Sequence, residues 1–280
     1  LRTDPISNRL FKPMRSVFEL GSIFKIFNTA LALENGIDSK KEYYVAKPFP
    51  IYDKHGRIAK NITDIRSFKP PRPSINVEEI MVHSCNVGSA QIALELPDNA
   101  QKEFFERLNM GSALDLEFGR TERTLLPKKW GPVERATVSF GHGLAVTPMH
   151  LMLGVNAVTN GGIYIYPTLQ KRSVGVVRGE RVLADEISAK LRPIMLRVAE
   201  ETSGKKARVA GVKIAGKTAT AEKYTNGKID TINIGNFKIG VLRIANDIIE
   251  AYTIKLNNLP NHNSHIAFKS NNLANNIPIA

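Results

Sequence analysis

The amino-acid sequence predicts a mixed α/β domain of the α+β type, built from several apolar helices and a smaller set of strands. Apolar residues recur at helical spacing over residues 22–35, 87–94 and 99–109. Three stretches that contain β-branched or aromatic residues, at 163–167, 212–215 and 217–224, are typical of strands. No internal repeat is present, so the sequence does not indicate a solenoid or a propeller.

Start and stop signals delimit the expected helices. The helix over 22–35 ends at Asn35-Gly36, a frequent helix terminus. A shorter helix is expected over 77–82. Pro148 stands in the first turn of the helix expected to run to about residue 159, where proline is tolerated. The long helix expected over 185–201 contains Pro193 in its interior.

The composition of the chain excludes several classes of function. The 280 residues carry 39 Lys and Arg against 26 Asp and Glu, a net charge of +13. These basic residues are scattered rather than gathered in a stripe with aromatic residues, so the chain does not read as a nucleic-acid-binding protein. Cys85 is the single cysteine, which excludes an internal disulfide. No apolar run approaches the roughly 20 residues of a membrane-spanning helix, and no signal peptide opens the sequence.

Two features of the ends suggest an incomplete domain. The chain begins at Leu1 without an initiator methionine, so we expect it to be part of a longer protein whose missing portion holds an anchor. Residues 231–280 contain eleven asparagines, as many as residues 1–230 together. We predict a domain over 1–230 and a divergent Asn/Ile-rich tail over 231–280. The tail is either a polar surface extension or a segment read out of frame from AT-rich DNA.

Ser22 and Lys25 form the first candidate for chemistry. They lie three residues apart at the start of the apolar helix, so their side chains share one face. Apolar surroundings lower the pKa of a lysine, and an uncharged amine can accept the proton of a hydroxyl. Many serines at helix starts are only caps, and a second Ser-x-x-Lys occurs at Ser203–Lys206. The pair alone therefore leaves both interpretations open.

Two further motifs offer partners for that pair. Ser84-Cys-Asn86 supplies a hydroxyl and an amide between two expected helices, although a helix cap explains it equally well and Ser74-Ile-Asn76 repeats the pattern. The segment Gly216-Lys-Thr-Ala-Thr220 supplies a cation and two hydroxyls on an expected strand. On a strand, Thr218 and Thr220 point to the same face and suit a substrate carboxylate; a solvated, threonine-rich edge strand is the plain alternative.

Together these motifs resemble the signature of the penicillin-binding protein transpeptidase family, Ser-x-x-Lys, Ser-x-Asn and Lys-Thr-Gly in that order. The flanking residues resemble the family as well, in Phe18-Glu-Leu-Gly-Ser-Ile-Phe-Lys25, Ser84-Cys-Asn-Val-Gly-Ser-Ala-Gln-Ile-Ala93, Ser139-Phe-Gly-His-Gly-Leu-Ala-Val-Thr-Pro148 and Ala215-Gly-Lys-Thr-Ala-Thr-Ala-Glu-Lys223. The resemblance covers about residues 1–230 and is strongest to the class B, FtsI-like enzymes of septal peptidoglycan cross-linking. It implies an antiparallel sheet flanked by helices, as in serine β-lactamases, plus an all-helical lobe.

The resemblance also implies a mechanism. A serine would attack the D-Ala-D-Ala carbonyl of a peptidoglycan stem peptide, release D-alanine as an acyl-enzyme forms, and pass the acyl group to an amine. Penicillins would acylate the same serine, and neither a cofactor nor a metal is implied. The implied roles are Ser22 as nucleophile, Lys25 as base, Ser84 as proton relay, Asn86 as substrate contact, Lys217 as a source of positive field, and Thr218 and Thr220 as carboxylate ligands.

Partners and location follow from the same resemblance. It implies stem peptides and β-lactams as ligands, division or cell-wall synthesis proteins as further partners, and the periplasmic face of the bacterial inner membrane as the site of action. Membrane association would depend on the missing anchor. Two alternatives stay open: a domain that binds penicillin or peptidoglycan without turnover, and a gene remnant without function.

Two departures from the family pattern bear on activity. Ala219 stands where the family has glycine, and its methyl group would crowd a substrate lying along the strand. The family has further strands after the Lys-Thr-Gly strand, which Asn236-Phe-Lys-Ile-Gly-Val241 matches only faintly. If the tail supplied no strands, the Lys217 strand would become an exposed edge and the site would be poorly held.

Overall fold

The computed structural model describes residues 12–65, 68–117, 119–168, 170, 178–202 and 213–219, together with five strands beyond them. Its helices are α2 (Lys12–Arg15), the 3₁₀ helix η1 (Gly21–Phe24), α3 (Lys25–Glu34), α4 (Val77–His83), α5 (Asn86–Glu95), α6 (Ala100–Arg107), α7 (Pro132–Val138), α8 (Pro148–Thr159) and α9 (Asp185–Glu201). The helices expected from apolar spacing are therefore present, with boundaries within two residues for most of them.

Strands pair antiparallel throughout the described part of the chain. A four-stranded sheet has the order β14-β13-β12-β9, and the other described strands form five two-stranded pairs. The strands are β1 (Glu42–Tyr44), β2 (Phe49–Tyr52), β3 (Ile58–Ile62), β4 (Ser74–Asn76), β5 (Asp115–Leu116), β6 (Gly119–Arg120), β7 (Ile163–Ile165), β8 (Gly179–Arg181), β9 (Lys213–Lys217), β10 (Lys223–Thr225), β11 (Lys228–Asp230), β12 (Ile239–Ile244), β13 (Ile248–Lys255) and β14 (His265–Ile266).

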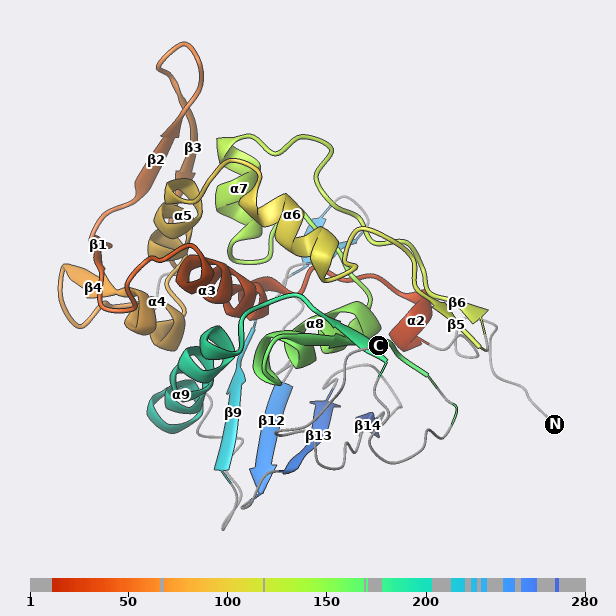
Figure 1. Cartoon of the computed structure of the whole chain (residues 1–280). Coiled ribbons are helices and arrows are strands. Elements are labelled where there is room, and N and C mark those ends of the chain that lie inside the picture. The colour runs from red at the N-terminus through yellow and green to blue at the C-terminus, as the bar shows by residue number, and fades with distance from the viewer. Residues whose placement is uncertain are drawn as a thin grey trace.

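The elements form layers. In Figure 1, helices α8 and α9 lie between the four-stranded sheet and the helices α3 to α7. Helix α9 packs on β9, while α3 contacts both α8 and α9. An antiparallel sheet with helices against it and a helical lobe beyond confirms the predicted α+β fold class. The strand that carries Lys217 is thereby held directly against the helical body.

Helix α3 runs through the middle of the helical body. Its residues from Lys25 to Leu33 are all buried, because apolar side chains surround the helix. Most of them join a large core with α6, α8 and α9, whereas Ala32 packs in a second core with α4, α5 and Phe140. A helix buried on every side is rigid, so a side chain at its first turn has a fixed position.

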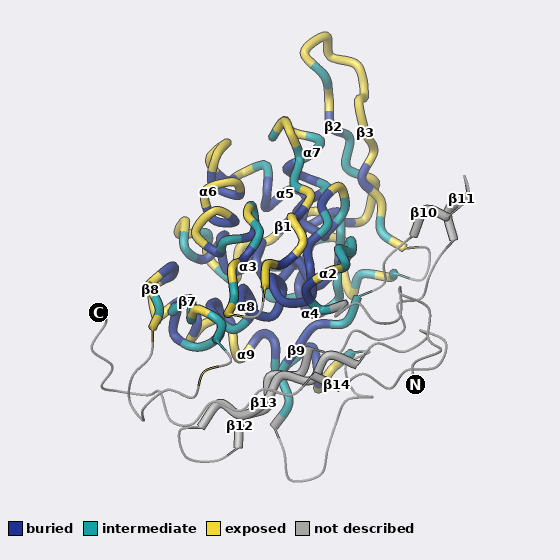
Figure 2. Tube along the Cα trace, turned by 90° about the vertical axis from the view of Figure 1, so that its right-hand side faces the viewer, coloured by how far each residue is buried: buried dark blue, intermediate teal, exposed yellow. Residues whose placement is uncertain are grey.

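The hairpin β2–β3 stands apart from this body. Figure 2 shows it as a largely exposed arm that projects beyond the dark-blue core. The chain returns from its second strand through Thr63 and Asp64 toward the start of α5.

Strand β12 pairs with β9, Ile239 opposite Lys217 and Val241 opposite Ala215. Strand β13 continues the sheet beyond β12. The strand that ends at Lys217 therefore has a neighbour, and that neighbour comes from the Asn/Ile-rich tail. The boundary at residue 230 and the origin of the tail stay predictions.

Candidate active site

Ser22 and Lys25 meet at the junction of a 3₁₀ turn and an α-helix. In 3₁₀ geometry the side chains of residues three apart eclipse one another, and η1 contains Ser22 while α3 begins at Lys25. The Lys25 Nζ donates a hydrogen bond of 2.8 Å to the Ser22 Oγ. The Lys25 side chain is only 1% exposed, whereas Ser22 is partly accessible. The turn therefore presents the hydroxyl to solvent and keeps the amine beneath it.

The Ser84-Cys-Asn86 segment reaches the same amine from another part of the chain. Lys25 Nζ lies 2.7 Å from Asn86 Oδ1 and 3.5 Å from Ser84 Oγ. Ser84 caps α4 in the left-handed region, at φ 63°, which is costly for a residue with a side chain. This corner between α4 and α5 turns both polar side chains toward Lys25. Backbone strain at such a place is typical of functional sites.

The second Ser-x-Asn has a different role. Ser74 lies in β4, and the side chain of Asn76 accepts a hydrogen bond from the Glu79 N–H at the start of α4. The Glu79 carboxylate in turn accepts from the Asn76 N–H, which completes a capping box. This copy is a helix cap. The second Ser-x-x-Lys, Ser203–Lys206, lies outside the described residues.

Burial tunes the Lys25 amine. It lowers the pKa of Lys25 from its ordinary value of 10.5 to about 7, although the nearby Asp64 carboxylate acts in the opposite direction. The Phe140 ring contributes to this apolar environment, with its centre 5.7 Å from Nζ. An amine with a pKa near neutrality is available both to accept a proton and to return it.

Lys217 ends strand β9 close to this cluster. Its side chain is 2% exposed, and its Nζ donates a 3.1 Å hydrogen bond to the Thr218 carbonyl. Burial and the positive charge of Lys25 both lower the pKa of Lys217 well below its usual range. The charge of Lys25 therefore acts on the Lys217 amine. Thr218 follows directly and is partly buried, while Thr220 lies outside the described residues.

The sequence did not indicate Asp64 as part of the site. Its Oδ1 accepts a hydrogen bond from the Asn86 N–H, and its Oδ2 accepts one of 3.2 Å from the Cys85 thiol. Cys85 itself caps α5, because its Sγ accepts from the Gly88 N–H. Asp64 thus anchors the Ser84-Cys-Asn86 corner from 22 residues away. No local spacing links the two segments, so only the folded chain reveals the contact.

Comparison with known proteins bears on this arrangement. The sequence model of the penicillin binding protein transpeptidase domain matches residues 3–260. The chain is 32% identical over 221 residues to the probable peptidoglycan D,D-transpeptidase FtsI of Caulobacter vibrioides, covering 77% of this chain and 36% of that protein. It is also 30% identical over 232 residues to stage V sporulation protein D of Bacillus subtilis, covering 77% of this chain and 34% of that protein.

This chain belongs to the penicillin-binding protein transpeptidase family. The resemblance to class B, FtsI-like members is thereby confirmed. The fold agrees: the TP domain of penicillin-binding protein 3 from Burkholderia pseudomallei superimposes with a TM-score of 0.69 at 24% identity, covering 80% of this chain and 66% of that one. The chain spans about a third of the length of the two curated relatives above, 36% and 34%.

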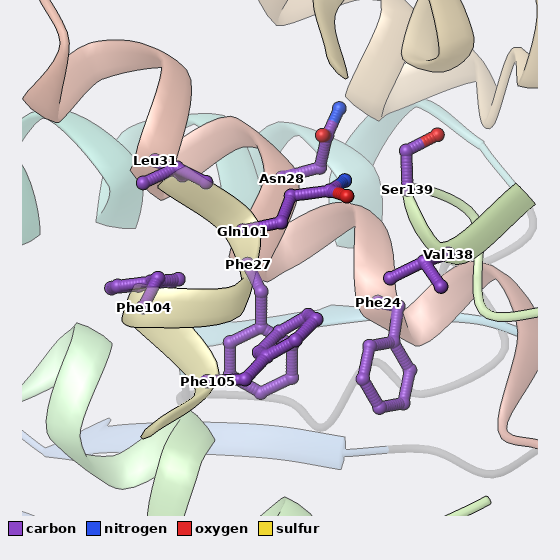
Figure 3. A pocket seen from close by; sticks show the side chains of 9 residues that line it. All are labelled: Phe24, Phe27, Asn28, Leu31, Gln101, Phe104, Phe105, Val138 and Ser139. Atoms are coloured by element: carbon purple, nitrogen blue, oxygen red, sulfur yellow. The ribbon is translucent and has the colours of Figure 1, made fainter. Parts of the chain in front are cut away.

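Aromatic side chains from other elements also pack around helix α3. Figure 3 shows a small pocket where Phe24 of η1 and Phe27 of α3 meet Phe105 of α6. The side-chain amide oxygens of Asn28 and Gln101 are buried without a hydrogen-bond partner among the described residues. The pocket contains neither Ser22 nor Lys25, so it belongs to the packing of α3 and not to the candidate active site.

The described residues contain neither a candidate metal site nor a candidate membrane-spanning helix. No group of three or more His, Cys, Asp or Glu side chains there has the arrangement of a metal site. Nor does any helix in the same residues have both the length and the apolar character needed to span a bilayer.

Proposed function

We propose that this transpeptidase domain cross-links peptidoglycan stem peptides through an acyl-enzyme on Ser22, as a D,D-transpeptidase of septal cell-wall synthesis. The Ser22 oxygen attacks the carbonyl of the penultimate D-alanine, and the peptide bond to the terminal D-alanine breaks. An amine from a neighbouring stem peptide then attacks the acyl-enzyme, restoring Ser22 and forming the cross-link. The names of the FtsI relatives, which describe D,D-transpeptidases, support this reaction.

Lys25 moves the proton in each step. Its neutral amine, 2.8 Å from the Ser22 Oγ, takes the hydroxyl proton as the carbon–oxygen bond forms. Ser84 then passes a proton to the nitrogen of the leaving D-alanine, since its Oγ is also within reach of Nζ. Deacylation reverses the order: the acceptor amine gives up a proton and Ser22 recovers one.

The strand that ends at Lys217, with the residues after it, binds the substrate carboxylate. The carboxylate of the terminal D-alanine places a negative charge beside the buried Lys217 amine. This charge raises the pKa of Lys217 toward the ordinary range. Thr218 and Thr220 donate hydrogen bonds to the same carboxylate. The backbone N–H groups of Ser22 and Thr220 stabilise the oxyanion, each worth about 3–4 kcal/mol by the size of such effects elsewhere.

One observation carries the proposal: a single buried amine, Lys25 Nζ, reaches side chains of Ser22, Ser84 and Asn86. A serine that only caps a helix does not require a buried lysine amine next to its hydroxyl. Ser84 and Asn86 lie 59 and 61 positions after Lys25 in the sequence, yet both contact the same amine as Ser22. This arrangement supports the proposed roles of nucleophile, base and relay.

Labelling with a fluorescent penicillin tests the proposal. We expect one covalent adduct per chain, mapped to the peptide containing Ser22 by mass spectrometry, and no adduct on Ser22→Ala. A folded wild-type chain without an adduct would contradict the acylation step. Wild-type chain supplied with a stem-peptide donor and an amine acceptor should then give cross-linked product. Acylation without such product would indicate the alternative, a domain that binds penicillin but does not turn over.

The setting of the reaction is part of the same proposal. Stem peptides and β-lactams are the expected ligands. Division or cell-wall synthesis proteins are the expected partners, at the periplasmic face of the inner membrane. Fractionation of cells that express the full-length protein would check the location: recovery from the cytosol alone would contradict it.

A further inference from the structure

A segment far from the motifs in sequence runs along the approach to the nucleophile. We call residues 140–146 the flanking segment. Its Val146 pairs with Phe18 through two backbone hydrogen bonds of 3.0 and 3.1 Å. Its Gly143 N–H donates to the Glu19 Oε1 at 3.2 Å. These contacts fix the two residues that lead into the turn carrying Ser22.

Two glycines bring the backbones of the two segments together. Gly21, directly before Ser22, has φ 53°, and Gly141 has φ 83°, both in the left-handed region. A Cβ on Gly141 would lie 2.0 Å from the Gly21 carbonyl oxygen and 2.7 Å from its Cα. Real Cβ atoms do not come so near to backbone, so a side chain here would displace Gly21 and with it the turn. The absence of a side chain at position 141 allows the nucleophile turn to sit where it does.

The same segment contacts the base. The Phe140 ring centre is 5.7 Å from Lys25 Nζ, and the His142 ring packs against Phe140 with a centroid separation of 5.3 Å. The flanking segment therefore contacts the Ser-x-x-Lys motif at both ends, through Gly141 beside Gly21 and through Phe140 beside Lys25. Hydrogen bonds of Gly141 and His142 to Val138 and Thr137 hold the segment on the end of α7.

From this geometry we propose that Gly141 is a positioning residue for the nucleophile: the flanking segment sets the place of the Ser22 turn relative to Lys25 by backbone contact with Gly21. The inference rests on the proposed function, since it assigns Ser22 as the group to be positioned. A displacement of about 1 Å at such a site costs on the order of 100-fold in rate, because the attacking oxygen loses its alignment.

Substitution of two glycines with similar backbone conformations tests the proposal. Gly141→Ala places a methyl group against the Gly21 backbone. Gly56→Ala, in the turn of the exposed β2–β3 hairpin, is the matched control, because Gly56 also has a positive φ, 76°, and its Cβ would meet nothing within 4 Å. The acylation rate constant and the preceding binding constant are measured separately with a fluorescent penicillin. We expect Gly141→Ala to lower the rate constant by about 100-fold with little change in binding, and Gly56→Ala to stay within about twofold.

A second readout does not depend on acylation. Amide hydrogen exchange of the peptide spanning residues 18–27 reports the turn directly, and it separates failure of this inference from failure of the proposed function. Gly141→Ala should speed exchange there, while Gly56→Ala should not. Equal rate constants and equal exchange in the two variants and the wild type would overturn the inference, whether or not the wild type is acylated.

A milder variant covers the case in which Gly141→Ala does not fold. Glu19→Ala removes the acceptor of the Gly143 N–H, whereas Glu19→Gln keeps an acceptor oxygen in place. We expect Glu19→Ala to lower the acylation rate constant several-fold and to speed exchange over residues 18–27. Glu19→Gln should restore both. Identical behaviour of Glu19→Ala and wild type would count against the role of the flanking segment.

Discussion

Two tripeptides of the same pattern, Ser74-Ile-Asn76 and Ser84-Cys-Asn86, flank helix α4 and do different work. The first makes its hydrogen bonds locally, in a capping box between Asn76 and Glu79. The second makes them across the fold: Lys25 Nζ donates to the Asn86 Oδ1, and the Asn86 N–H donates to Asp64. The first stabilises the start of a helix, and the second assembles a site.

The difference teaches that a short motif obtains its chemistry from tertiary partners. Both asparagines stand beside a helix start, where Asn is favoured. At Asn86 the capping function passes to the Cys85 sulfur, which accepts from the Gly88 N–H and frees the amide side chain for Lys25. Position 84 also takes a left-handed backbone, which 74 does not share because it lies in a strand.

The Lys25 amine is the contact that distinguishes Ser84-Cys-Asn86 from Ser74-Ile-Asn76, so its removal should have the largest effect. Lys25→Met keeps the length and apolar stem of the side chain but provides no base. We expect penicillin acylation of Ser22 to fall by about 10²- to 10⁴-fold, the usual worth of general base catalysis. Stopped-flow fluorescence with a labelled penicillin measures it. Lys102→Met, at an exposed lysine of α6, is the control and should leave the rate unchanged; an equal loss in both variants would contradict the account.

Exchanging the two asparagines for alanine compares the tripeptides directly. Asn86→Ala removes a 2.7 Å hydrogen bond to the Lys25 amine, and we expect acylation to fall by about 10- to 100-fold. Asn76→Ala removes half of a capping box, so it should lower the free energy of unfolding by about 1 kcal/mol and leave acylation intact. Urea unfolding and penicillin labelling of both variants give the two numbers. Slow acylation in the Asn76 variant would break the comparison.

Asp64→Asn tests the contact that the first tripeptide lacks. The carboxylate opposes the effect of burial on Lys25, so its loss lowers the pKa of Lys25 further. Because the neutral amine is the active form, the half-point of acylation against pH should move to lower pH in the variant. Asp53→Asn, in the exposed hairpin, is the matched control. A half-point that moves upward, or moves equally in both variants, would show that Asp64 acts otherwise.

The smallest effect is expected at a position outside both tripeptides. Ala219 packs against the core with its methyl group where the family has glycine. Ala219→Gly opens room along the Lys217 strand for a substrate, so acylation should rise by a few-fold through tighter binding of the penicillin. Titration of the acylation rate against penicillin concentration separates binding from chemistry. An unchanged binding constant would show that the methyl group does not obstruct the ligand.

The parts of the site that depend on local spacing could be predicted from the sequence. Apolar spacing places Ser22 and Lys25 on one helix face, and the Ser84 corner falls between two helices as expected. Spacing alone could not show which Ser-x-Asn copy belongs to the site, because that depends on which copy contacts Lys25. Asp64 and Gly141 could not be predicted for the same reason, since each contacts a segment that is distant in the sequence.

The sheet shows the other limit. Strand β9 was expected from its residues, but its partner β12 lies in a stretch whose Asn- and Ile-rich composition gives no clear strand period. Pairing between strands is a long-range contact, and local propensity does not encode which neighbour a strand takes. The fold class was therefore reachable through the resemblance of the motifs, whereas the position of the tail in the sheet was not.

The pH dependence of wild-type acylation tests the central claim most directly, namely that a desolvated Lys25 amine serves Ser22 as base. The rate of fluorescent penicillin labelling, measured from pH 5 to 10, should rise as Lys25 loses its proton, reach half its maximum near the pKa of about 7, and level off above it. A rate that continues to rise toward the ordinary lysine pKa of 10.5, or that does not change with pH, would contradict it.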